Sequence, residues 1–405
     1  MTALTPMLQQ YLEIKEQHKD ELLFFRLGDF YELFNEDALT ASRELNLTLT
    51  KRAGGKAGAS SSMPMCGVPF HSVDGYLAKL IRKGYKIAIC DQMEDPKKAV
   101  GIVKRQVTKI LTPGTVLSDA VLEENHNQYL ACLEQQEDTL CLAYADVSTG
   151  ECAWYTARGK DREEAVLDQL YRIQPAELVL TESTEAFGGL LDKMVQKLPD
   201  CMVNQYDPVP GLDYFTRHFG SDCPAGKLPL VRGTVEHMLQ YIHENVKSDL
   251  AQINRLREIT TDAVMNLDAT AIRNLELVKN MKDGTRHGTL LDVLDYIRTA
   301  MGARQLRQWV EAPLLDTARI RLRQQAIGWM VDNARFRTDL GDALSEITDL
   351  ERILSRIEVG SANARDLAAL RTALRALPQV KSLLDQVPQG LLHTLDGRIS
   401  LHEDL

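Results

Sequence analysis

The chain has 405 residues, of which 44% are hydrophobic, and its formal net charge is −10 at pH 7. This length supports two or three domains with separate cores and argues against one compact unit. No run of about 18 or more apolar residues occurs, and the first residues are amphipathic and charged rather than basic and then apolar. We therefore expect a cytoplasmic protein with no membrane partner.

The charges are distributed unevenly along the chain. Residues 1–110 contain 16 Lys and Arg against 13 Asp and Glu, whereas the remainder contains 31 against 44, so the two parts carry +3 and −13. If the protein binds a nucleic acid, we expect the N-terminal part to meet it first. The seven cysteines form no CxxC pair, and no histidine cluster has zinc-ligand spacing, so we expect buried thiols, no disulfide and no metal site.

The first 110 residues predict an α/β domain. A helix follows Thr5, a candidate N-cap, and Pro6; two extended segments then flank Gly28-Asp29. Further helices are expected near 37–45 and 73–81, the second closed by Gly84, and a strand over 86–90. The composition of residues 51–62 predicts a flexible loop.

A Pro-Gly segment, residues 111–124, predicts a linker, and a second α/β domain is expected over 125–245. Three strand patterns, YLACLEQ, TLCLAYADVS and ECAWYTA, predict a meander, followed by a helix over EEAVLDQLYRI and a strand over ELVL. From about Val231 the patterns are helical without strand candidates, including RNLELVKNM, LLDVLDYIRTAMGARQLRQWV and DLERILSRI. Residues 246–405 are therefore expected to be mainly α-helical.

The segment RLGDFYELF, residues 26–34, is the most informative one. On a strand, alternate side chains share a face, so Phe30 and Glu32 project together while Tyr31 and Leu33 point the other way. Taken alone, this pairing of an aromatic ring with a carboxylate favours a half-buried strand of no special function.

The wider context resembles one family. GDFYELF and the segment MCGVPFHSVDGYLAKLIRKGYKIAICDQMEDP (65–96) are similar to the mismatch-reading region of the MutS family of DNA mismatch-recognition proteins. LDATAIRNLEL, DGTRHGTLLDVLD, TAMGARQLRQWVEAPL and DLERILSRI resemble the helical core, or lever, domain of the same family. Phe70 departs from the pattern, because the family commonly has Tyr there.

The resemblance implies an α/β mismatch-binding domain over 1–110, an RNase H-like connector domain over 125–245 and the first part of a helical core domain over 246–405. The family's clamp and ATPase domains are expected to be absent. No GxxxxGK[ST] motif occurs, and GGKAG (54–58) lacks its upstream glycine and the Ser/Thr after the lysine. We therefore expect no enzymatic activity and no cofactor in this chain; ATP and magnesium belong to the family's ATPase domain.

The implied function is recognition of mispaired duplex DNA. Phe30 would stack on or wedge beside a mispaired base from the minor groove, and Glu32, either protonated or ionised, would hydrogen-bond that base. Pro64, Met65 and His71, in a loop beside the sensing strand, and Lys51, Arg52 and Lys56 are possible DNA contacts, with a packed loop and solvated lysines as the alternative. A MutL-like protein and a homodimer are the implied partners.

Three alternatives remain open. The chain could be a truncated interaction fragment that binds a MutL-like partner without useful DNA affinity. Asp146 and Glu151 on adjoining strands could belong to a nuclease, although a two-metal site needs more carboxylates, so a structural role is favoured. Arg304, Arg307 and Arg321 to Arg323 could contact nucleic acid, although a solvated helix face is favoured.

Overall fold

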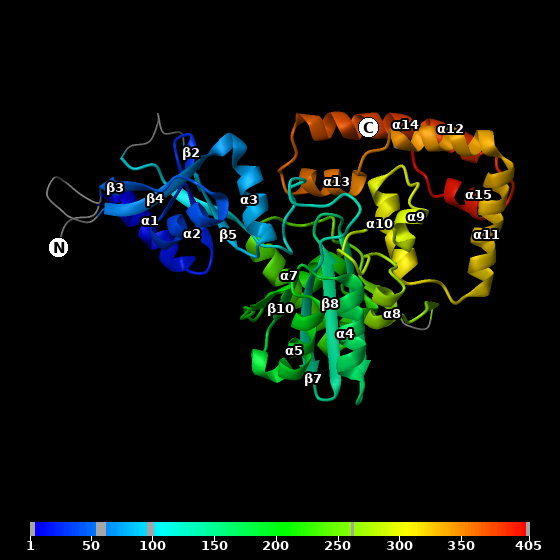
Figure 1. Ribbon diagram of the computed structural model, residues 1–405, viewed down its shortest axis with the longest axis horizontal. Helices are drawn as coiled ribbons and strands as arrows, with labels where there is room; N and C mark the ends of the chain where they lie inside the picture. Colours follow the sequence, from blue (N-terminus) through cyan, green and yellow to red (C-terminus); the bar gives the residue numbers. More distant parts are fainter. Residues whose placement is uncertain (1–4, 54–61, 95–100, 261–262, 402–405) are drawn as a thin grey trace.

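The computed structural model describes residues 5–53, 62–94, 101–260 and 263–401. It shows two domains built on β-sheets, followed by an array of helices (Figure 1). The N-terminal domain lies at one side, the second domain below the centre, and the helices form an arch in which α12 and α14 run along the top and α11 runs down the far side.

The first domain is a six-stranded sheet in the order β3-β4-β2-β1-β5-β6, in which only β1 and β5 pair in parallel. The predicted helices at its start, near 37–45 and over 73–81 are confirmed, as are the extended segments around Gly28-Asp29. Its elements are α1 (Pro6–Gln17), β1 (Leu22–Leu27), β2 (Phe30–Phe34), α2 (Asn35–Leu45), β3 (Thr50–Ala53), β4 (Ser62–Pro69), the 3-10 turn η1 (Phe70–Ser72), α3 (Val73–Arg82), β5 (Ile87–Gln92) and β6 (Arg105–Leu111).

The two faces of this sheet are covered by different helices. Alternate residues of β2, Tyr31 and Leu33, join a core with apolar residues of α2 and α3. Phe34 points to the opposite face, where Leu8 and Tyr11 of α1 pack against it. The period-2 alternation predicted for a strand is thus confirmed, and each face has its own core.

The prediction of a flexible loop over residues 51–62 is wrong at its two ends. Lys51 lies in β3, Ser62 lies in β4, and the two strands pair antiparallel, with Lys51 opposite Pro64. Composition predicted a loop for this Gly- and Ser-rich sequence, but the backbone hydrogen bonds of the sheet extend into both of its ends. Residues 54–61 lie outside the described part of the chain.

The segment from Thr112 to Tyr129 contains no helix or strand and runs between the two sheets. Side chains from the helical region hold its backbone: Arg304 NH1 donates to Glu124 O at 3.1 Å and Arg352 NH2 donates to His126 O at 2.7 Å. Arg356 adds an ion pair to Asp119 at 2.7 Å. These contacts attach the linker to the third region.

The second domain is a sheet in the order β11-β10-β7-β8-β9-β12. The predicted meander is confirmed, because β7, β8 and β9 pair antiparallel in sequence, while β10 and β11 extend the sheet in parallel to β7. Its elements are β7 (Leu130–Gln136), β8 (Thr139–Asp146), β9 (Glu151–Arg158), α4 (Arg162–Ile173), β10 (Glu177–Leu180), η2 (Thr184–Phe187), α5 (Gly188–Lys197), β11 (Met202–Gln205), α6 (Tyr214–Phe219), η3 (Pro224–Lys227), α7 (Pro229–Val246) and β12 (Arg257–Glu258).

One feature after Val231 differs from the prediction of helices without strands. The helix α7 agrees with that prediction, and its Val235, Met238 and Leu239 pack on one face of the sheet of the second domain. The two-residue strand β12 returns to pair with β9 in parallel. A two-residue strand is too short to give a periodic pattern, so the sequence carried no signal for it.

The third region is helical, as predicted, but its helices are shorter at the start. RNLELVKNM was predicted to be helical, yet α8 ends at Asn274, and Glu276 adopts a left-handed φ of 47°. Side-chain bonds from Asn280 to Thr285 and to the His287 carbonyl stabilise turns there instead. The helices are α8 (Ala269–Asn274), α9 (Leu290–Leu294), α10 (Ala300–Glu311), α11 (Thr317–Asp332), α12 (Ala334–Ser345), α13 (Leu350–Glu358), α14 (Ala364–Leu384) and α15 (Leu391–Asp396).

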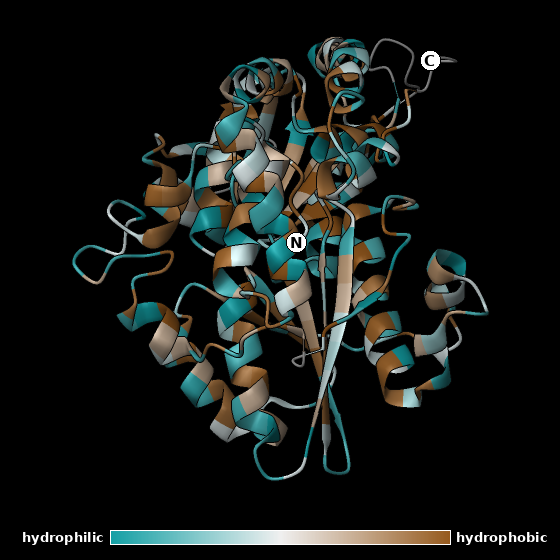
Figure 2. Ribbon diagram, turned by 90° about the vertical axis from the view of Figure 1, so that its right-hand side faces the viewer, coloured by the Kyte–Doolittle hydropathy of each residue, from teal (hydrophilic) through white to brown (hydrophobic). Residues whose placement is uncertain are grey.

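The helix α11 has no buried residue, and Ile327 and Val331 on it are more than half exposed. On this side of the molecule apolar and polar residues alternate over the surface of the helices (Figure 2). Among the described residues, no helix is long and apolar enough to cross a membrane.

All seven cysteines are free thiols. Five are buried, as predicted, whereas Cys201 and Cys223 are only partly buried. Burial raises the pKa of the Cys66 thiol to about 11 and that of Cys90 to about 12, so both remain protonated near neutral pH.

Candidate nucleic-acid interface

Phe30 and Glu32 lie on the same face of β2, in the first residues of the strand after the hairpin turn that joins it to β1. The side chain of Phe30 is 46% exposed, and Glu32 is partly buried, whereas Tyr31 and Leu33 between and beyond them are buried. The structure therefore brings together the two residues on which the sequence analysis depended, with an aromatic ring in solvent beside a carboxylate.

The hairpin turn fixes where Phe30 lies. Leu27 pairs with Phe30 across the turn, and Gly28 adopts a φ of +59°, a conformation that glycine adopts without strain. The backbone N–H of Phe70 donates to Asp29 O at 2.9 Å, which attaches the turn to the end of β4. The exposed ring thus lies at the end of an interior strand that is paired with β1 on one side and β4 on the other.

The opposite end of the same strand face is closed by α1. The ring of Tyr11 lies edge-on to Phe34 at 4.8 Å between centroids, and Phe34 is fully buried. Asp37 accepts the Leu23 backbone N–H at 3.0 Å and forms an ion pair with Lys15 at 3.0 Å. Burial raises the pKa of Asp37, because the cost of desolvating its ionised form outweighs the attraction of Lys15 and the hydrogen bonds to the carboxylate.

The strand β4 forms the floor next to Glu32. Gly67 pairs with Glu32, and a Cβ built on Gly67 would lie 3.2 Å from Tyr31 O and 3.4 Å from Glu32 Cγ. On the other side, Glu32 pairs with Phe25, which is fully buried. Glu32 therefore stands between a glycine and a large buried ring, and the space for its side chain depends on Gly67 having none.

The other face of β2 is anchored by Tyr31. Its hydroxyl donates to Asp91 Oδ1 at 2.6 Å, and Thr108 donates to the other oxygen of that carboxylate at 2.8 Å. Burial and the Asp91 carboxylate raise the pKa of Tyr31, so the phenol stays protonated as the donor. This network holds the strand in register across β1 and β5.

The structure describes some, but not all, of the residues that were predicted as further DNA contacts. Lys51 is exposed on β3, and Arg52 follows it in that strand. Lys56 lies outside the described residues. His71 is exposed in η1.

Pro64 and Met65 were expected in a loop beside the sensing strand, and this expectation is wrong. Both lie in β4, which is hydrogen-bonded to β2 and β3 on its two sides, and both are partly buried. Met65 pairs with Phe34 and packs on the core under α1, so it belongs to the closed end of the face.

Three neighbours of the interface were missed by the sequence analysis as contributors. Besides Gly67, these are Phe70, which is 43% exposed, and Arg26, whose guanidinium lies 3.6 Å from the centre of the Phe70 ring. The cation–π contact orients a second exposed ring beside the sensing end. The sequence signal for Phe70 was its position directly after Pro69, the last residue of β4.

The carboxylates considered for a nuclease lie opposite each other, with Asp146 on β8 paired with Glu151 on β9. Asp146 accepts from Asn127, from the Gln128 N–H and from Ser148. Glu151 accepts from the Tyr129 hydroxyl at 2.7 Å and forms an ion pair with Arg257 at 2.6 Å. Protein donors thus occupy both groups, which agrees with the favoured structural role. No group of three or more potential metal ligands occurs within the described ranges.

The arginines of the third region differ among themselves. Arg304, favoured as part of a solvated helix face, is only 3% exposed and forms ion pairs with Asp349 and Glu351, both at 2.6 Å. That interpretation is therefore wrong for Arg304, and the buried network also removes it from nucleic-acid contact. Arg307 forms an ion pair with Glu311, whereas Arg321 is exposed.

Three family models match the chain in succession. MutS domain I matches residues 5–120, MutS domain II matches residues 128–208, and MutS domain III matches residues 270–404. The first match contains the whole sheet that carries Phe30 and Glu32. The helix α7 lies between the second and third matches.

Curated relatives align over the whole chain. The DNA mismatch repair protein MutS of Desulforamulus reducens is 42% identical over 100% of this chain and 47% of its own length. The protein of the same name from Symbiobacterium thermophilum is 41% identical over 99% of the chain and 46% of its length, and that of Brevibacillus brevis is 41% identical over 98% and 44%. The chain spans about half the length of these relatives.

Proposed function

The chain belongs to the MutS family, and from this premise we propose that its first domain recognises mispaired duplex DNA through Phe30 and Glu32. The observation that carries the proposal is the 46% exposure of the Phe30 ring at the open end of a sheet face whose other end is sealed by α1. A large aromatic side chain left in solvent at the end of a strand that is paired on both sides is suited to insertion between bases.

The energetics favour mispairs over matched pairs. Inserting an apolar wedge from the minor groove unstacks a base step at a cost of a few kcal/mol and kinks the duplex. Because a mismatched base is the least costly to unstack, the same wedge discriminates against matched DNA. Stacking of an aromatic ring on a base contributes about 1 to 3 kcal/mol, which is enough to decide between the two.

Glu32 supplies the polar part of the reading. Standing on the same face as Phe30, its carboxyl group would hydrogen-bond the base beside the wedge. An acceptor at this position can be satisfied by a base N–H that a mispair leaves accessible, whereas a matched pair keeps its N–H groups in Watson–Crick bonds. Discrimination would then combine deformability with one hydrogen bond.

Lys51 and Arg52 of β3, together with Lys56 a few positions later in the sequence, would position phosphates rather than read bases. Their contribution would weaken with salt for matched and mispaired duplexes alike, because it comes from counterion release. The ratio of the two affinities should therefore change less with salt than either affinity alone.

Fluorescence anisotropy with a G·T duplex and its matched counterpart, each at two salt concentrations, tests the proposal. The chain should prefer the mispair, and Phe30→Ala should lose about 1 to 3 kcal/mol of that preference. Leu39→Ala removes another exposed apolar side chain of this domain, 40% exposed on α2, and should leave the preference unchanged. Equal binding of both duplexes by the unmodified chain would contradict the proposal and favour a fragment that acts through protein partners.

For the second domain, we propose an RNase H-like fold used as a connector. The support is its topology: three antiparallel strands in sequence, then two strands added in parallel beside the first of them, with helices between. A MutL-like protein is the partner that family membership suggests for this domain, and a homodimer is the suggested assembly. Binding of a purified MutL-like protein to residues of the second domain, and sedimentation equilibrium, test these two proposals.

A further inference from the structure

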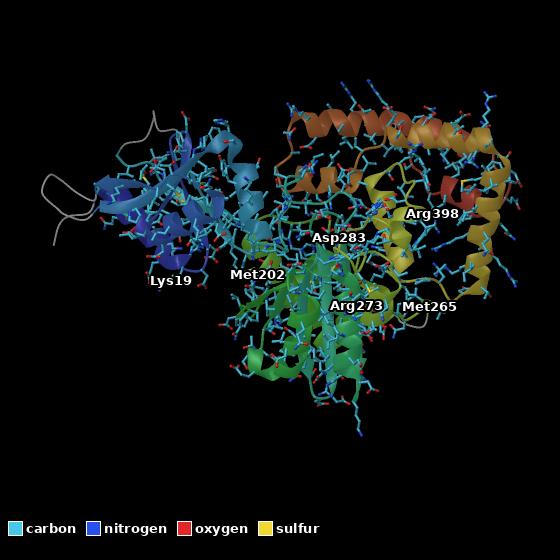
Figure 3. The ribbon with its side chains drawn as sticks, in the orientation of Figure 1. Lys19, Met202, Met265, Arg273, Asp283 and Arg398 are labelled. Atoms are coloured by element: carbon cyan, nitrogen blue, oxygen red, sulfur yellow. The ribbon has the colours of Figure 1, made fainter. Side chains whose placement is uncertain are left out.

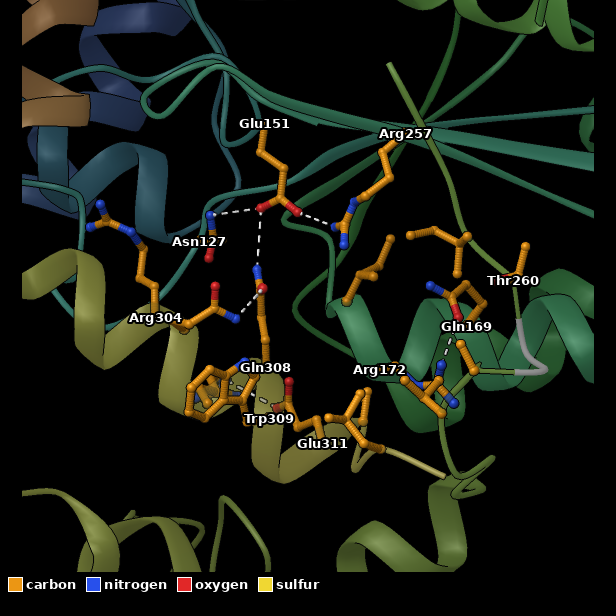
Figure 4. Close-up of a pocket in the computed structure, with 18 of the residues that line it drawn as sticks. Asn127, Glu151, Gln169, Arg172, Arg257, Thr260, Arg304, Gln308, Trp309 and Glu311 are labelled. Carbon is orange, nitrogen blue, oxygen red and sulfur yellow. Dashed lines mark hydrogen bonds and ion pairs between the residues drawn. The ribbon is translucent and has the colours of Figure 1, made fainter. Parts of the chain in front are cut away.

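A cavity of about 600 Å³ lies between the second domain and the third region, far from β2 in the chain. Its walls come from α4 of the second domain, from α10 and α11 of the third region and from the segment after α15. Figure 4 shows Arg172 and Gln169 of α4 facing Gln308, Trp309 and Glu311 of α10. This volume is that of a small-molecule site and far too small for a duplex.

The cavity is strongly basic. Seven arginines line it against three carboxylates, Glu151, Glu258 and Glu311. His126 adds no charge, because burial and the nearby Arg307 lower its pKa to about 3. The seven are Arg172, Arg257, Arg304, Arg307, Arg319, Arg323 and Arg398.

Only some of these charges are balanced within the protein. Arg304, Arg257 and Arg307 have carboxylate partners. Arg172 donates only to the neutral amide oxygens of Gln169 and Asn266, at 3.2 and 3.0 Å. Arg319, Arg323 and Arg398 form no ion pair with any residue that the structure describes, so three of the lining arginines have no carboxylate partner, and Arg172 is near only Glu311, which already pairs with Arg307.

Two of the arginines that line the cavity also have N–H groups without a hydrogen-bond partner. Arg307 NH2 and Arg172 Nε are buried and have no hydrogen-bond partner among the described residues. A buried donor without a partner costs free energy, and charged groups cost the most. Arg307 belongs to the third region and Arg172 to the second domain, so unpartnered donors occur on both sides of the cavity.

One of the lining arginines, Arg323, stacks on the ring of Trp309, which also lines the cavity. The guanidinium of Arg323 lies 3.7 Å from the centre of the Trp309 ring, and Arg319, one turn earlier on α11, lines the same cavity. Burial lowers the pKa of Arg323, and the nearby charge of Arg319 lowers it further. Figure 3 shows Arg398 on the inner side of the helical arch, toward α10.

We propose that this cavity binds an oligophosphate anion, either free pyrophosphate or the phosphate chain of a nucleotide. Guanidinium groups bind phosphate oxygens through paired, charge-assisted hydrogen bonds, and an anion with more than one negative charge balances several arginines at once. Because the chain has no phosphate-binding loop motif, this would be a phosphate site of a different construction. Its ligand would join the second domain to the third region.

Calorimetric titration of the whole 405-residue chain with pyrophosphate, at physiological salt and without magnesium, tests the proposal. One saturable site is expected. The same titration is then made with adenosine diphosphate. An affinity equal to that of pyrophosphate assigns recognition to the phosphates alone, whereas a higher affinity shows that the nucleoside also contacts the cavity. Both results support the site.

Arg319→Ala and Arg323→Ala should each weaken pyrophosphate binding by about tenfold, because each removes one charge-assisted contact. The matched control is Arg321→Ala, which removes an exposed arginine from the same helix that does not line the cavity, and it should leave the affinity within about twofold. Since α11 has no buried residue, these variants should keep the fold, which their circular dichroism and melting temperatures check.

A thermal shift gives a second readout. Pyrophosphate should raise the melting temperature of the unmodified chain and not that of the Arg319→Ala/Arg323→Ala double variant. Absence of saturable binding, or equal weakening by Arg321→Ala, would overturn the proposal, because the first excludes a site and the second shows only general attraction to a basic surface.

Discussion

The two phenylalanines of β2 show how one strand face can serve two purposes. Phe34 and Phe30 point to the same side of the sheet, yet Phe34 is fully buried under Tyr11 of α1, and Phe30 is 46% exposed. The residue type and the strand are the same, so the difference comes from how far α1 extends across the face. At one end the ring stabilises the domain, and at the other it is available to a partner.

The largest expected effect is on the closed end. Phe34→Ala should lower the free energy of unfolding of the first domain by about 3 to 5 kcal/mol, because it removes a buried ring and leaves a cavity. Urea denaturation followed by circular dichroism measures this loss. A change below about 1 kcal/mol would mean that the core under α1 collapses to fill the space, and the contrast between the two ends would be weaker than described.

At the open end, Phe30→Leu distinguishes the contribution of aromatic stacking to mispair preference from that of an apolar side chain acting as a wedge. Leucine keeps an apolar wedge without an aromatic face, so mispair preference should fall by about 1 kcal/mol, the lower end of the range for stacking. The free energy of unfolding should change by less than about 0.5 kcal/mol, since the side chain is largely in solvent. Anisotropy titrations and urea denaturation of the same preparation report both values, and a full loss of preference would assign all discrimination to stacking.

The carboxylate at the closed end predicts a dependence on pH. The pKa of Asp37 is raised above its ordinary value of 3.8 by burial, so its protonated form is favoured in the folded state. The contribution of this group to stability is therefore full below pH 3.8 and is lost as the pH rises through the folded-state pKa.

Urea denaturation of the unmodified chain and of Asp37→Asn between pH 4 and pH 8 isolates that contribution. The difference in stability between the two proteins should shift in favour of Asp37→Asn as the pH rises, because only the carboxyl group ionises. A difference in unfolding free energy that does not change with pH would show that the pKa of Asp37 is the same in the folded and unfolded chains.

The smallest effect is expected at Gly67. The Cβ of Gly67→Ala would lie 3.2 Å from the backbone oxygen of Tyr31, which must shift by a few tenths of an ångström, and 3.4 Å from Glu32 Cγ, an ordinary contact that such a shift would disturb. Mispair preference should fall by less than about 1 kcal/mol, the net contribution of a typical hydrogen bond. Gly75→Ala, where a Cβ meets nothing within 4 Å, is the matched control in the same domain.

Much of this contrast could be predicted from the sequence, and part could not. The period-2 rule placed Phe30 and Glu32 on one face, because it depends only on strand geometry. Which end of that face is open depends on the packing of Tyr11 against Phe34, which lie 23 positions apart, and no local pattern encodes it. The site residues were therefore identifiable, while their exposure was not.

Arg304 illustrates the same limit in the third region. Its place on a charged helix predicted a solvated side chain, because the sequence around it gives no carboxylate partner at helical spacing on that face. The partners are Asp349, the N-cap of α13, and Glu351 in its first turn, both more than 40 positions later. Long-range ion pairs of this kind are invisible to periodicity, and so is the basic cavity that the neighbouring arginines form.

The central claim is that Phe30 enters the base stack at a mispair. A duplex carrying 2-aminopurine beside a G·T mispair tests it most directly, because the fluorescence of this base rises when it is unstacked. We expect a rise when the unmodified chain binds and none at saturation with Phe30→Ala. An equal rise with both proteins, or no rise with either, would contradict the assignment of Phe30 as the wedge.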